Sequence, residues 1–320
     1  MAAAPIDRST SWPYEDGEPG PFTYTRFSNP TVAEAERALG ALDGGEALLF
    51  ASGTAASAAV ALALLGPGQT VALAEGAYYG SGVLLRELER WGLRHVEFDQ
   101  TGTPPPGVDL VWLEAPSNPF LTMPDFEAAA AHPAHVLCDA TAATPLHVRP
   151  LEKGCDIVLH SATKFLAGHD DALVGALAFR DAIPAARVRE FRSRTGAVAA
   201  PDVAWLLLRG LATLELRVAR QTESARTLVE RLRRHPSVET VRYPGFGGLI
   251  SFDVADAEVA RRVETGTRLV ANMTSLGGVT TRIEARARWE GDRVPPGLLR
   301  LSVGLEDPDA LWPDLEQALA

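Results

Sequence analysis

Short apolar runs alternate with helical patterns through the first half of the chain. The apolar runs predict strands over residues 47–50, 70–74, 95–98, 110–114, 135–139 and 157–161. Between them, apolar residues recur at helical spacing and predict helices over 32–42, 82–91 and 124–131, with a further helix of small residues after 52–54. Short apolar strands that alternate with helices are typical of an α/β protein with a mostly parallel sheet.

The second half of the chain predicts a smaller domain behind a long helix. Apolar spacing predicts one helix over 202–235, followed by strands over 249–254 and 299–303 and by helices over 257–263 and 310–319. A helix of about 34 residues exceeds the usual length in one domain, so we expect it to bridge two domains. The predicted divisions are an arm (1–32), a sheet domain (33–207) and a C-terminal α/β domain with the bridging helix (208–320).

The arm is rich in proline and glycine, which leaves little regular structure. It has no core of its own, so it must lie against its own subunit or a neighbouring one.

Composition excludes several classes of function. The 320 residues carry 30 basic and 41 acidic side chains, a formal net charge of −11, which disfavours nucleic acid and anionic membranes as partners. The arginine-rich stretch 217–234 is interleaved with glutamates at helical spacing, as on a solvated helix face. No apolar run reaches the roughly 18 residues of a membrane span, and the N-terminus shows no signal pattern. We therefore expect a cytoplasmic protein. Cys138 and Cys155 lack metal-ligand spacing and are expected to be buried free thiols, so no metal is predicted.

The strongest chemical signal is the stretch DIVLHSATKFLAGHDD, residues 156–171. An apolar strand delivers Lys164 into a turn, beside the hydroxyls of Ser161 and Thr163. A lysine amine held in apolar surroundings loses its proton more easily and can form a Schiff base with an aldehyde. The two hydroxyls would suit a phosphate next to that lysine. A lysine at a capped helix start is the alternative reading.

Two further features fit the same chemistry. Asp139 ends a predicted strand 25 positions before Lys164, where a carboxylate could keep the ring nitrogen of pyridoxal phosphate (PLP) protonated. Alone, it also reads as a structural aspartate. Gly53 and Thr54 begin a helix of small residues, and the free N–H groups of a helix N-terminus bind phosphate.

Several segments together resemble one enzyme family. SATKFLAGHDD is similar to the PLP-lysine segment of the Cys/Met-metabolism enzymes, which include cystathionine γ-lyase, cystathionine γ-synthase, cystathionine β-lyase and methionine γ-lyase. CDATAATP, WLEAPSNPFL, YTRFSNPT, FASGTAAS, GAYYGSG, LLLRGLATLELR and LLRLSVGLEDPDAL also match, in family order over nearly the whole chain. The resemblance implies the aspartate-aminotransferase-like fold (fold type I), with a smaller C-terminal α/β domain, and a homotetramer.

The resemblance also implies roles for individual residues. Lys164 matches the Schiff-base lysine and base, and Asp139 the partner of the ring nitrogen. Tyr79 matches the tyrosine that stacks on the ring and assists proton transfer. The remaining matches concern phosphate and substrate: Ser161, Thr163, Gly53 and Thr54 for phosphate, Tyr24 and Arg26 for phosphate in a neighbouring subunit, Asn118 near the ring, Glu114 as structural, and Arg300 as the clamp on the substrate α-carboxylate.

The sequence departs from the family pattern in two substrate regions. Val83 and Leu84 stand where members usually carry an arginine. After Gly277–Gly278 the chain reads VTTRIEARARWE, so Thr280, Thr281 and Arg282 stand where members carry Ser-Leu and often a preceding glutamate. We expect Thr281 still to bind a carboxylate. Arg282, Arg286 and Arg288 either receive an anionic substrate tail or lie on a surface helix neutralised by Glu284 and Glu290.

Three classes of function remain open at this point. The leading hypothesis is a lyase that cleaves the Cγ–S bond of cystathionine, with γ-replacement on an O-acyl-homoserine, or methionine γ-lyase or β-lyase chemistry, as alternatives that use the same cofactor residues. A PLP-binding protein without turnover is a second class, although it would need no carboxylate clamp at Arg300. A purely structural α/β protein is a third.

Overall fold

Residues 46–179 build the large sheet, in which seven strands lie in the order β1-β7-β6-β5-β4-β2-β3. The computed structural model describes residues 5–320, so residues 1–4 of the predicted arm lie outside the described part. Neighbouring strands are parallel except where β7 pairs with β1 and β6. The predicted mostly parallel α/β sheet is therefore confirmed. Its strands are β1 (Glu46–Phe50), β2 (Thr70–Ala74), β3 (Arg94–Phe98), β4 (Leu110–Glu114), β5 (His135–Asp139), β6 (Ile157–His160) and β7 (Gly175–Phe179).

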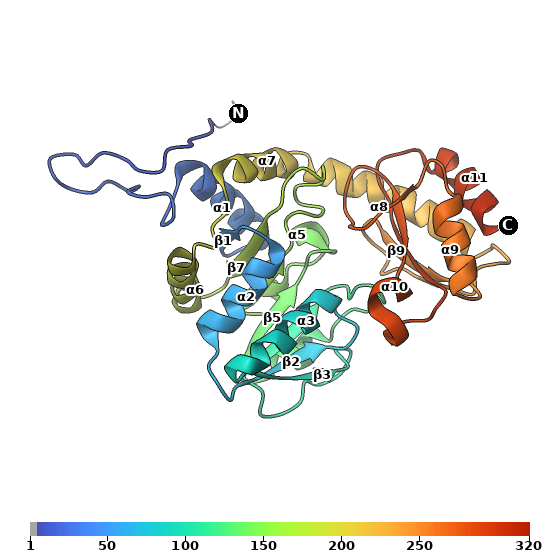
Figure 1. Cartoon of the computed structure of the whole chain (residues 1–320), viewed down its shortest axis with the longest axis horizontal. Coiled ribbons are helices and arrows are strands. Elements are labelled where there is room, and N and C mark those ends of the chain that lie inside the picture. The colour runs from blue at the N-terminus through green and yellow to red at the C-terminus, as the bar shows by residue number, and fades with distance from the viewer. Residues whose placement is uncertain (1–4) are drawn as a thin grey trace.

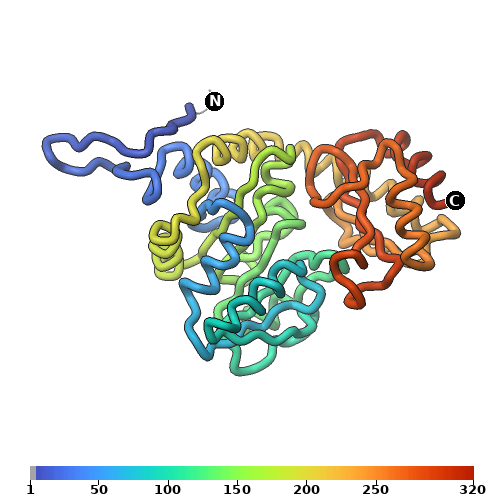
Figure 2. Tube along the Cα trace, viewed as in Figure 1, coloured from blue at the N-terminus to red at the C-terminus, as the bar shows by residue number. Residues whose placement is uncertain are grey.

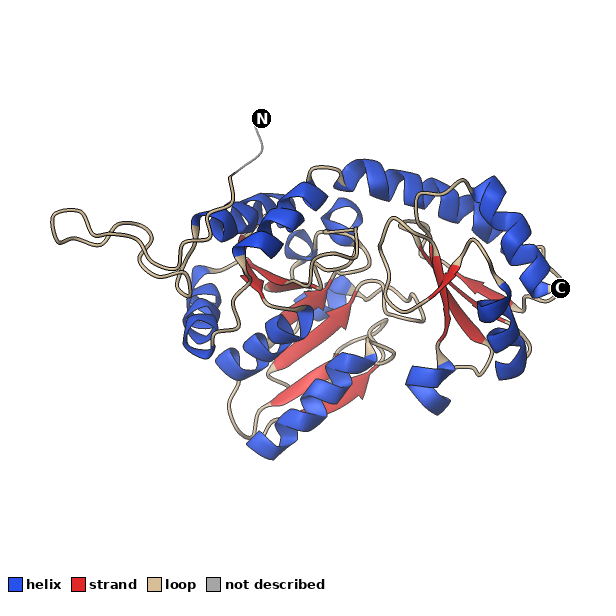
Figure 3. Cartoon of the chain, turned by 45° about the horizontal axis from the view of Figure 1, so that its top comes forward, coloured by secondary structure: helices blue, strands red, loops and turns tan. Residues whose placement is uncertain are grey.

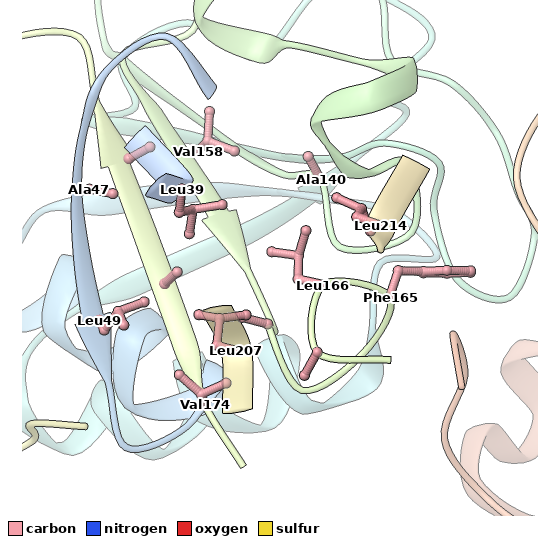
Figure 4. Close-up of a cluster of buried hydrophobic side chains, with 14 of the residues drawn as sticks. Leu39, Ala47, Leu49, Ala140, Val158, Phe165, Leu166, Val174, Leu207 and Leu214 are labelled. Carbon is pink, nitrogen blue, oxygen red and sulfur yellow. The ribbon is translucent and has the colours of Figure 1, made fainter. Parts of the chain in front are cut away.

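Helices cover both faces of the large sheet (Figure 1). Side chains alternate across a strand, so Leu48 and Leu49 of β1 enter different cores. Figure 4 shows the core that contains Leu49, where Leu39 of α1 and Leu207 of α7 pack against the sheet. The covering helices are α1 (Pro30–Asp43) and α7 (Pro201–Leu211) on this face, and α2 (Gly53–Leu64), α3 (Tyr79–Leu88) and α6 (Ala182–Thr195) on the other.

Helix α1 illustrates how local sequence sets the element boundaries. The Asn29 side chain accepts hydrogen bonds from the backbone N–H groups of Thr31 and Val32, and Pro30 occupies the first turn, where its missing N–H costs nothing. Gly44 ends the helix with φ at 80°, in the left-handed region that glycine tolerates. The chain then turns directly into β1. Shorter helical segments are α4 (Phe126–Ala130) and α5 (Thr144–His147), with 3₁₀ turns at Glu89–Trp91 and Pro150–Lys153.

The single helix predicted over 202–235 is wrong, because the structure has two helices there, α7 and α8 (Leu214–Leu232). Gly210 lies so close to the loop after Lys164 that an added Cβ would meet the carbonyl oxygen of Ala167 at 2.5 Å. The buried guanidinium of Arg217, in the first turn of α8, donates to the carbonyl of Gly210 at 2.7 Å. This satisfies the end of α7 and lets the chain change direction. The domain boundary after residue 207 stays a prediction.

The C-terminal part contains a second sheet of five strands, in the order β10-β11-β12-β9-β8 (Figure 3). Only β10 and β11 pair in parallel. One face packs against α8, α9 and α11 in a core of its own. The elements are β8 (Thr240–Arg242), β9 (Leu249–Asp253), α9 (Ala257–Gly266), β10 (Ala271–Asn272), β11 (Arg282–Ala285), α10 (Ala287–Glu290), a 3₁₀ turn (Gly291–Arg293), β12 (Leu298–Ser302) and α11 (Pro308–Leu319).

The N-terminal arm extends away from both sheets (Figure 2). Between residues 5 and 29 it contains isolated bridges and turns but no helix or strand. Within residues 5–320, no helix combines the length and the apolar character that crossing a bilayer requires.

Candidate active site

A cavity of about 420 Å³ opens where the large sheet faces the C-terminal part. Nine of the twelve predicted site residues line it, namely Gly53, Thr54, Tyr79, Asn118, Asp139, Ser161, Thr163, Lys164 and Arg300. The strands β4, β5 and β6 end there, so their carboxyl ends bring Glu114, Asp139 and Ser161 to one edge of the sheet, as ligand sites in such sheets require.

Lys164 lies in the turn that follows β6. Its backbone N–H donates to the carbonyl of Ser161, and its carbonyl accepts from Gly168, whose φ of 73° closes the turn. The side-chain Nζ donates to the Ser275 hydroxyl at 2.7 Å. Burial, with the nearby positive charge of Arg300, lowers the pKa of Lys164 to about 8. About a tenth of this amine is then neutral at pH 7, far more than for an ordinary lysine.

Asp139 is a buried carboxylate in which one oxygen accepts hydrogen bonds and the other accepts none from the described residues. Its Oδ1 accepts hydrogen bonds from the backbone N–H and the hydroxyl of Thr141. Within residues 5–320 no hydrogen-bond donor reaches Oδ2, although the side chain is only 7% exposed. Burial raises the pKa of Asp139, while the Thr141 hydrogen bonds oppose that rise. An uncommitted buried oxygen at a cavity wall suits a ligand N–H.

A cradle for a phosphate forms where α2 begins. Ser52 caps the helix by accepting from the backbone N–H of Ala55, and the N–H groups of Gly53 and Thr54 precede that bond. A Cβ on Gly53 would meet the Cβ and Oγ of Ser161 at 3.0 and 3.1 Å, so glycine permits the close approach of helix and strand end. The Thr163 hydroxyl donates to the carbonyl of Val174 at 3.1 Å, so its proton is engaged in this structure.

Two adjacent tyrosines stand at the start of α3. Tyr79 lines the cavity, and its ring contacts the ring of Tyr78 edge to face, with centroids 4.9 Å apart. Burial raises the pKa of Tyr78 to about 12, which keeps its hydroxyl protonated. The buried Glu114 carboxylate accepts from the backbone N–H of Tyr78 at 2.6 Å, and burial raises its pKa well above the usual value. Glu114 therefore holds the tyrosine turn.

Arg300, from β12, lines the cavity from the C-terminal part and shares Ser275 with Lys164. Its Nη1 donates to Oδ1 of Asn118 at 3.0 Å, and its Nη2 donates to the carbonyl of Ser275 at 3.0 Å and to Glu284 at 2.8 Å. Burial and the neighbouring Arg286 lower the pKa of Arg300 to about 10, so it remains a cation at neutral pH. A fixed guanidinium beside an amide is a suitable receptor for a carboxylate.

The predicted substrate contact of Thr281 is not found, because this side chain lies outside the cavity. It is fully buried, donates to Glu306 at 2.6 Å and accepts from the backbone N–H of Gly304 at 2.8 Å. Arg282 is likewise buried and paired with Asp170, away from the cavity lining. The polar residues of this segment that line the cavity are Thr274 and Ser275, which come before Gly277–Gly278 and not after it.

For Arg286 and Arg288, the sequence left two interpretations open: a receptor for an anionic substrate tail, or a surface helix neutralised by glutamates. The structure agrees with each of them only in part. Arg286 lines the cavity, but it is 2% exposed and paired with Glu284 and Glu290. Arg288 is half-exposed and pairs with Glu264. These residues belong to β11, α10 and the residue between them rather than to a surface helix.

Tyr24 and Arg26 do not reach the cavity of their own chain. Arg26 donates to the carbonyl of Ser193 at 2.6 Å, and its guanidinium lies over the rings of Tyr24 and Phe27, 5.3 and 4.9 Å from their centroids. The arm that carries them projects outward (Figure 2).

Sequence reasoning missed several lining residues, among them Thr141, Ser275, Tyr78 and Trp289. Thr141 has a local signal, a hydroxyl two positions after a strand-ending aspartate, which forms an Asx-type turn. Ser275 depends on long-range packing and adopts φ of 85°, so no local pattern indicates it.

The residues present fit PLP. The cavity supplies an amine, an open carboxylate oxygen and a helix N-terminus in one enclosure, matching the aldehyde, the ring nitrogen and the phosphate of that cofactor. Within residues 5–320, no group of three or more histidine, cysteine, aspartate or glutamate side chains is arranged to hold a metal ion. Cys138 and Cys155 are both buried and free, as predicted.

Comparisons with known proteins point the same way. A family model described as Cys/Met metabolism PLP-dependent enzyme matches residues 1–320. An L-methionine gamma-lyase from Streptomyces avermitilis is 39% identical over 100% of this chain and 84% of its own length. A cystathionine gamma-synthase from Mycobacterium tuberculosis is 38% identical over 94% and 87%. The crystal structure of a cystathione gamma lyase (CalE6) from Micromonospora echinospora is 37% identical, with a TM-score of 0.93 over 99% of this chain and 93% of that one.

Proposed function

Because the chain belongs to the Cys/Met metabolism PLP-dependent enzymes and uses pyridoxal phosphate, we propose that it is a lyase that cleaves the Cγ–S bond of cystathionine. The family, the fold class, the cofactor and the enzyme class are as predicted from the sequence, so the readings as a structural protein and as a non-catalytic PLP-binding protein are set aside. The remaining question is which sulfur amino acid reacts, and how.

The observation that supports the proposal is that the Lys164 amine and the Arg300 guanidinium line one cavity and both donate to Ser275, at 2.7 and 3.0 Å. When bound, the cofactor supplies an electron sink for the pair of electrons left when the α-proton is removed. Lys164 is the residue that would hold the cofactor aldehyde. Its lowered pKa of about 8 makes it a competent base for the α-proton. Ser275 orients the amine.

The other residues bind and orient. Arg300 and Asn118 would hold the α-carboxylate of the substrate, which fixes the direction of its α-proton. Asp139 Oδ2 would keep the proton on the ring nitrogen, and Tyr79 would lie against the ring. The N–H groups of Gly53 and Thr54, with Ser161, would hold the phosphate. Cleavage then consumes water and releases cysteine, a keto acid and ammonia.

One observation favours a second candidate, methionine γ-lyase activity. The outer lining is apolar at Leu84, Leu173 and Trp289. The carboxylates in the lining are Glu114 and Asp139, and Glu114 is occupied by the tyrosine turn. A thioether without a distal ammonium group would fit such a lining well, whereas cystathionine must find its second ammonium partner in solvent or a neighbouring subunit. γ-Replacement on an O-acyl-homoserine stays a candidate because the mycobacterial relative is named as a cystathionine gamma-synthase.

Substrate incubations separate these candidates. The purified holoenzyme is offered cystathionine, methionine, and O-acyl-homoserine with cysteine, and kcat/KM is compared. Keto acid and ammonia from cystathionine at the highest kcat/KM support the proposal. A higher kcat/KM with methionine would replace it by the second candidate, and a thioether product from the third mixture would replace it by γ-replacement.

We also propose that the protein is a homotetramer in which the arm carries Tyr24 and Arg26 to a neighbour's phosphate cradle. The absence of both residues from their own chain's cavity lining supports this. Chains with Lys164→Ala and chains with Arg26→Ala, each inactive alone, are mixed after dissociation. Activity returns if the arm crosses between subunits, since some sites then combine an intact lysine with an intact arginine. No recovery in verified mixed oligomers would contradict it.

A further inference from the structure

Four charged side chains form a buried chain behind the substrate wall. Arg300 and Arg286 both donate to Oε2 of Glu284, at 2.8 and 2.6 Å, and Arg286 also donates to Glu290 at 2.7 Å. All four side chains are at least 96% buried. The other oxygen of Glu284 accepts from the indole N–H of Trp289 at 2.7 Å.

Arg286 also lines the cavity, but its guanidinium is paired with two buried carboxylates, those of Glu284 and Glu290. Its Nη1 and Nη2 each bond a carboxylate, and its Nε is buried with no partner among the described residues. What it contributes is charge. Two arginines and two glutamates sum to zero, so the set is neutral as a whole.

Neutrality matters because Glu284 competes with the substrate for Arg300. Without the charge of Arg286, two carboxylates would face a single guanidinium, and the set would carry one net negative charge where an anion must bind. Neighbouring Asn118 is neutral, and Tyr78 stays protonated, so neither replaces the lost cation. The next cations are Lys164, which belongs to the cofactor side, and Arg282 near it, which is paired with Asp170.

We propose that Arg286 is a positioning residue that shares Glu284 with Arg300 and so leaves Arg300 free to bind the substrate carboxylate. The inference rests on the carboxylate-binding role proposed for Arg300, and it makes the net charge of a buried four-residue set the determinant of substrate affinity. Removing the charge of Arg286 and removing the charge of Glu290 should therefore change the affinity for the substrate carboxylate in opposite directions.

The test measures binding rather than turnover. The probe is 4-(methylthio)butanoate, which has a carboxylate and a thioether but no amino group to react at the cofactor. Its dissociation constant for the holoenzyme is measured by calorimetry, beside that of the neutral 4-(methylthio)butanamide. Arg286→Met should weaken binding of the acid about tenfold, and Glu290→Gln should strengthen it about threefold, because the interactions act across a poorly solvated set. The amide should respond to neither change.

The double variant and a matched control complete the design. Arg286→Met with Glu290→Gln restores neutrality, so its affinity for the acid should return to near that of the wild type. Arg288→Gln removes an arginine of the same segment that is 46% exposed and pairs with Glu264, and should change nothing.

A purely structural role gives a different pattern, in which both single changes weaken binding of acid and amide alike and the double variant is worse than either. That pattern, or an unchanged affinity for the acid in Arg286→Met, overturns the proposal. If circular dichroism shows that Arg286→Met does not fold, Glu290→Gln alone still tests the proposal, because the proposal requires this change to strengthen binding of the acid. The probe is not turned over, so this binding test gives a result even if the enzyme does not cleave cystathionine.

Discussion

The two walls of the active-site cavity are built in different ways. The cofactor wall takes Asp139, Ser161 and Lys164 from the ends of β5 and β6, within one stretch of the large sheet. The substrate wall joins Arg300 to Asn118, which lies 182 positions earlier in the chain. The first wall depends on parallel strands that end at one edge. The second depends on how the small sheet docks against the large one, so each wall should fail in its own way when it is altered.

The largest effect is expected on the cofactor wall, from Asp139→Asn. The amide keeps the shape but loses the charge that would hold the proton on the ring nitrogen, so kcat should fall about a hundredfold or more. Steady-state kinetics of the PLP-saturated variant measures this. Asp171→Asn, at an exposed aspartate, is the control and should retain wild-type kcat. A kcat for Asp139→Asn within twofold of wild type would contradict the role given to this carboxylate.

On the substrate wall, Arg300→Met should raise KM about a hundredfold, because a charge-assisted hydrogen-bond pair to the carboxylate is lost. The variant should still bind PLP with an affinity close to that of the wild type, since Arg300 is not among the residues that would hold the phosphate or the ring nitrogen. Loss of cofactor together with substrate affinity would show that the two walls are not separable.

The difference between the walls also explains which site residues the sequence predicts and which it does not. Strand ends and the small-residue helix start are local features, so Asp139, Ser161, Lys164 and Gly53 could be placed from pattern and resemblance. Arg286 directly follows β11, whose pairing with β12 brings it beside Arg300, and Ser275 lies in the loop before β11, where its carbonyl accepts from Arg300. No local pattern encodes either contact. For the same reason the sequence predicts a contact for Thr281, which lies outside the cavity lining, and gives no sign of Ser275. The sequence does not predict the break between α7 and α8 because apolar spacing continues across it. The buried Arg217 at this break donates to the carbonyls of Phe165 and Leu166, which are distant in the sequence.

A smaller effect is expected from Gly53→Ala. The added methyl group would meet Ser161 at 3.0 to 3.2 Å and push the helix N-terminus away from the phosphate cradle. We expect about tenfold weaker binding of PLP, measured by titration of the apoprotein, with the KM for substrate little changed once the site is saturated. Gly66→Ala, beyond the other end of α2, meets its nearest atom at 3.8 Å and serves as the control. Equal losses in both variants would indicate general destabilisation of the helix.

The smallest effect concerns pH. Since the pKa of Lys164 is lowered to about 8, the neutral amine that captures the cofactor increases as pH rises through that value. The rate at which apoprotein captures PLP should rise about fivefold from pH 7 to pH 8 and level off above pH 9. Stopped-flow absorbance follows this. A rate that keeps rising past pH 10 would show that the amine is not desolvated.

The most direct test of the account is to locate the covalent bond to the cofactor. The chain contains two lysines, Lys164 in the cavity and Lys153 on the surface, so the second is a built-in control. The holoenzyme is reduced with borohydride, digested and analysed by mass spectrometry. We predict a pyridoxyl adduct on the peptide of Lys164 and none on that of Lys153. An unmodified Lys164 in a sample that retains full activity would contradict the account.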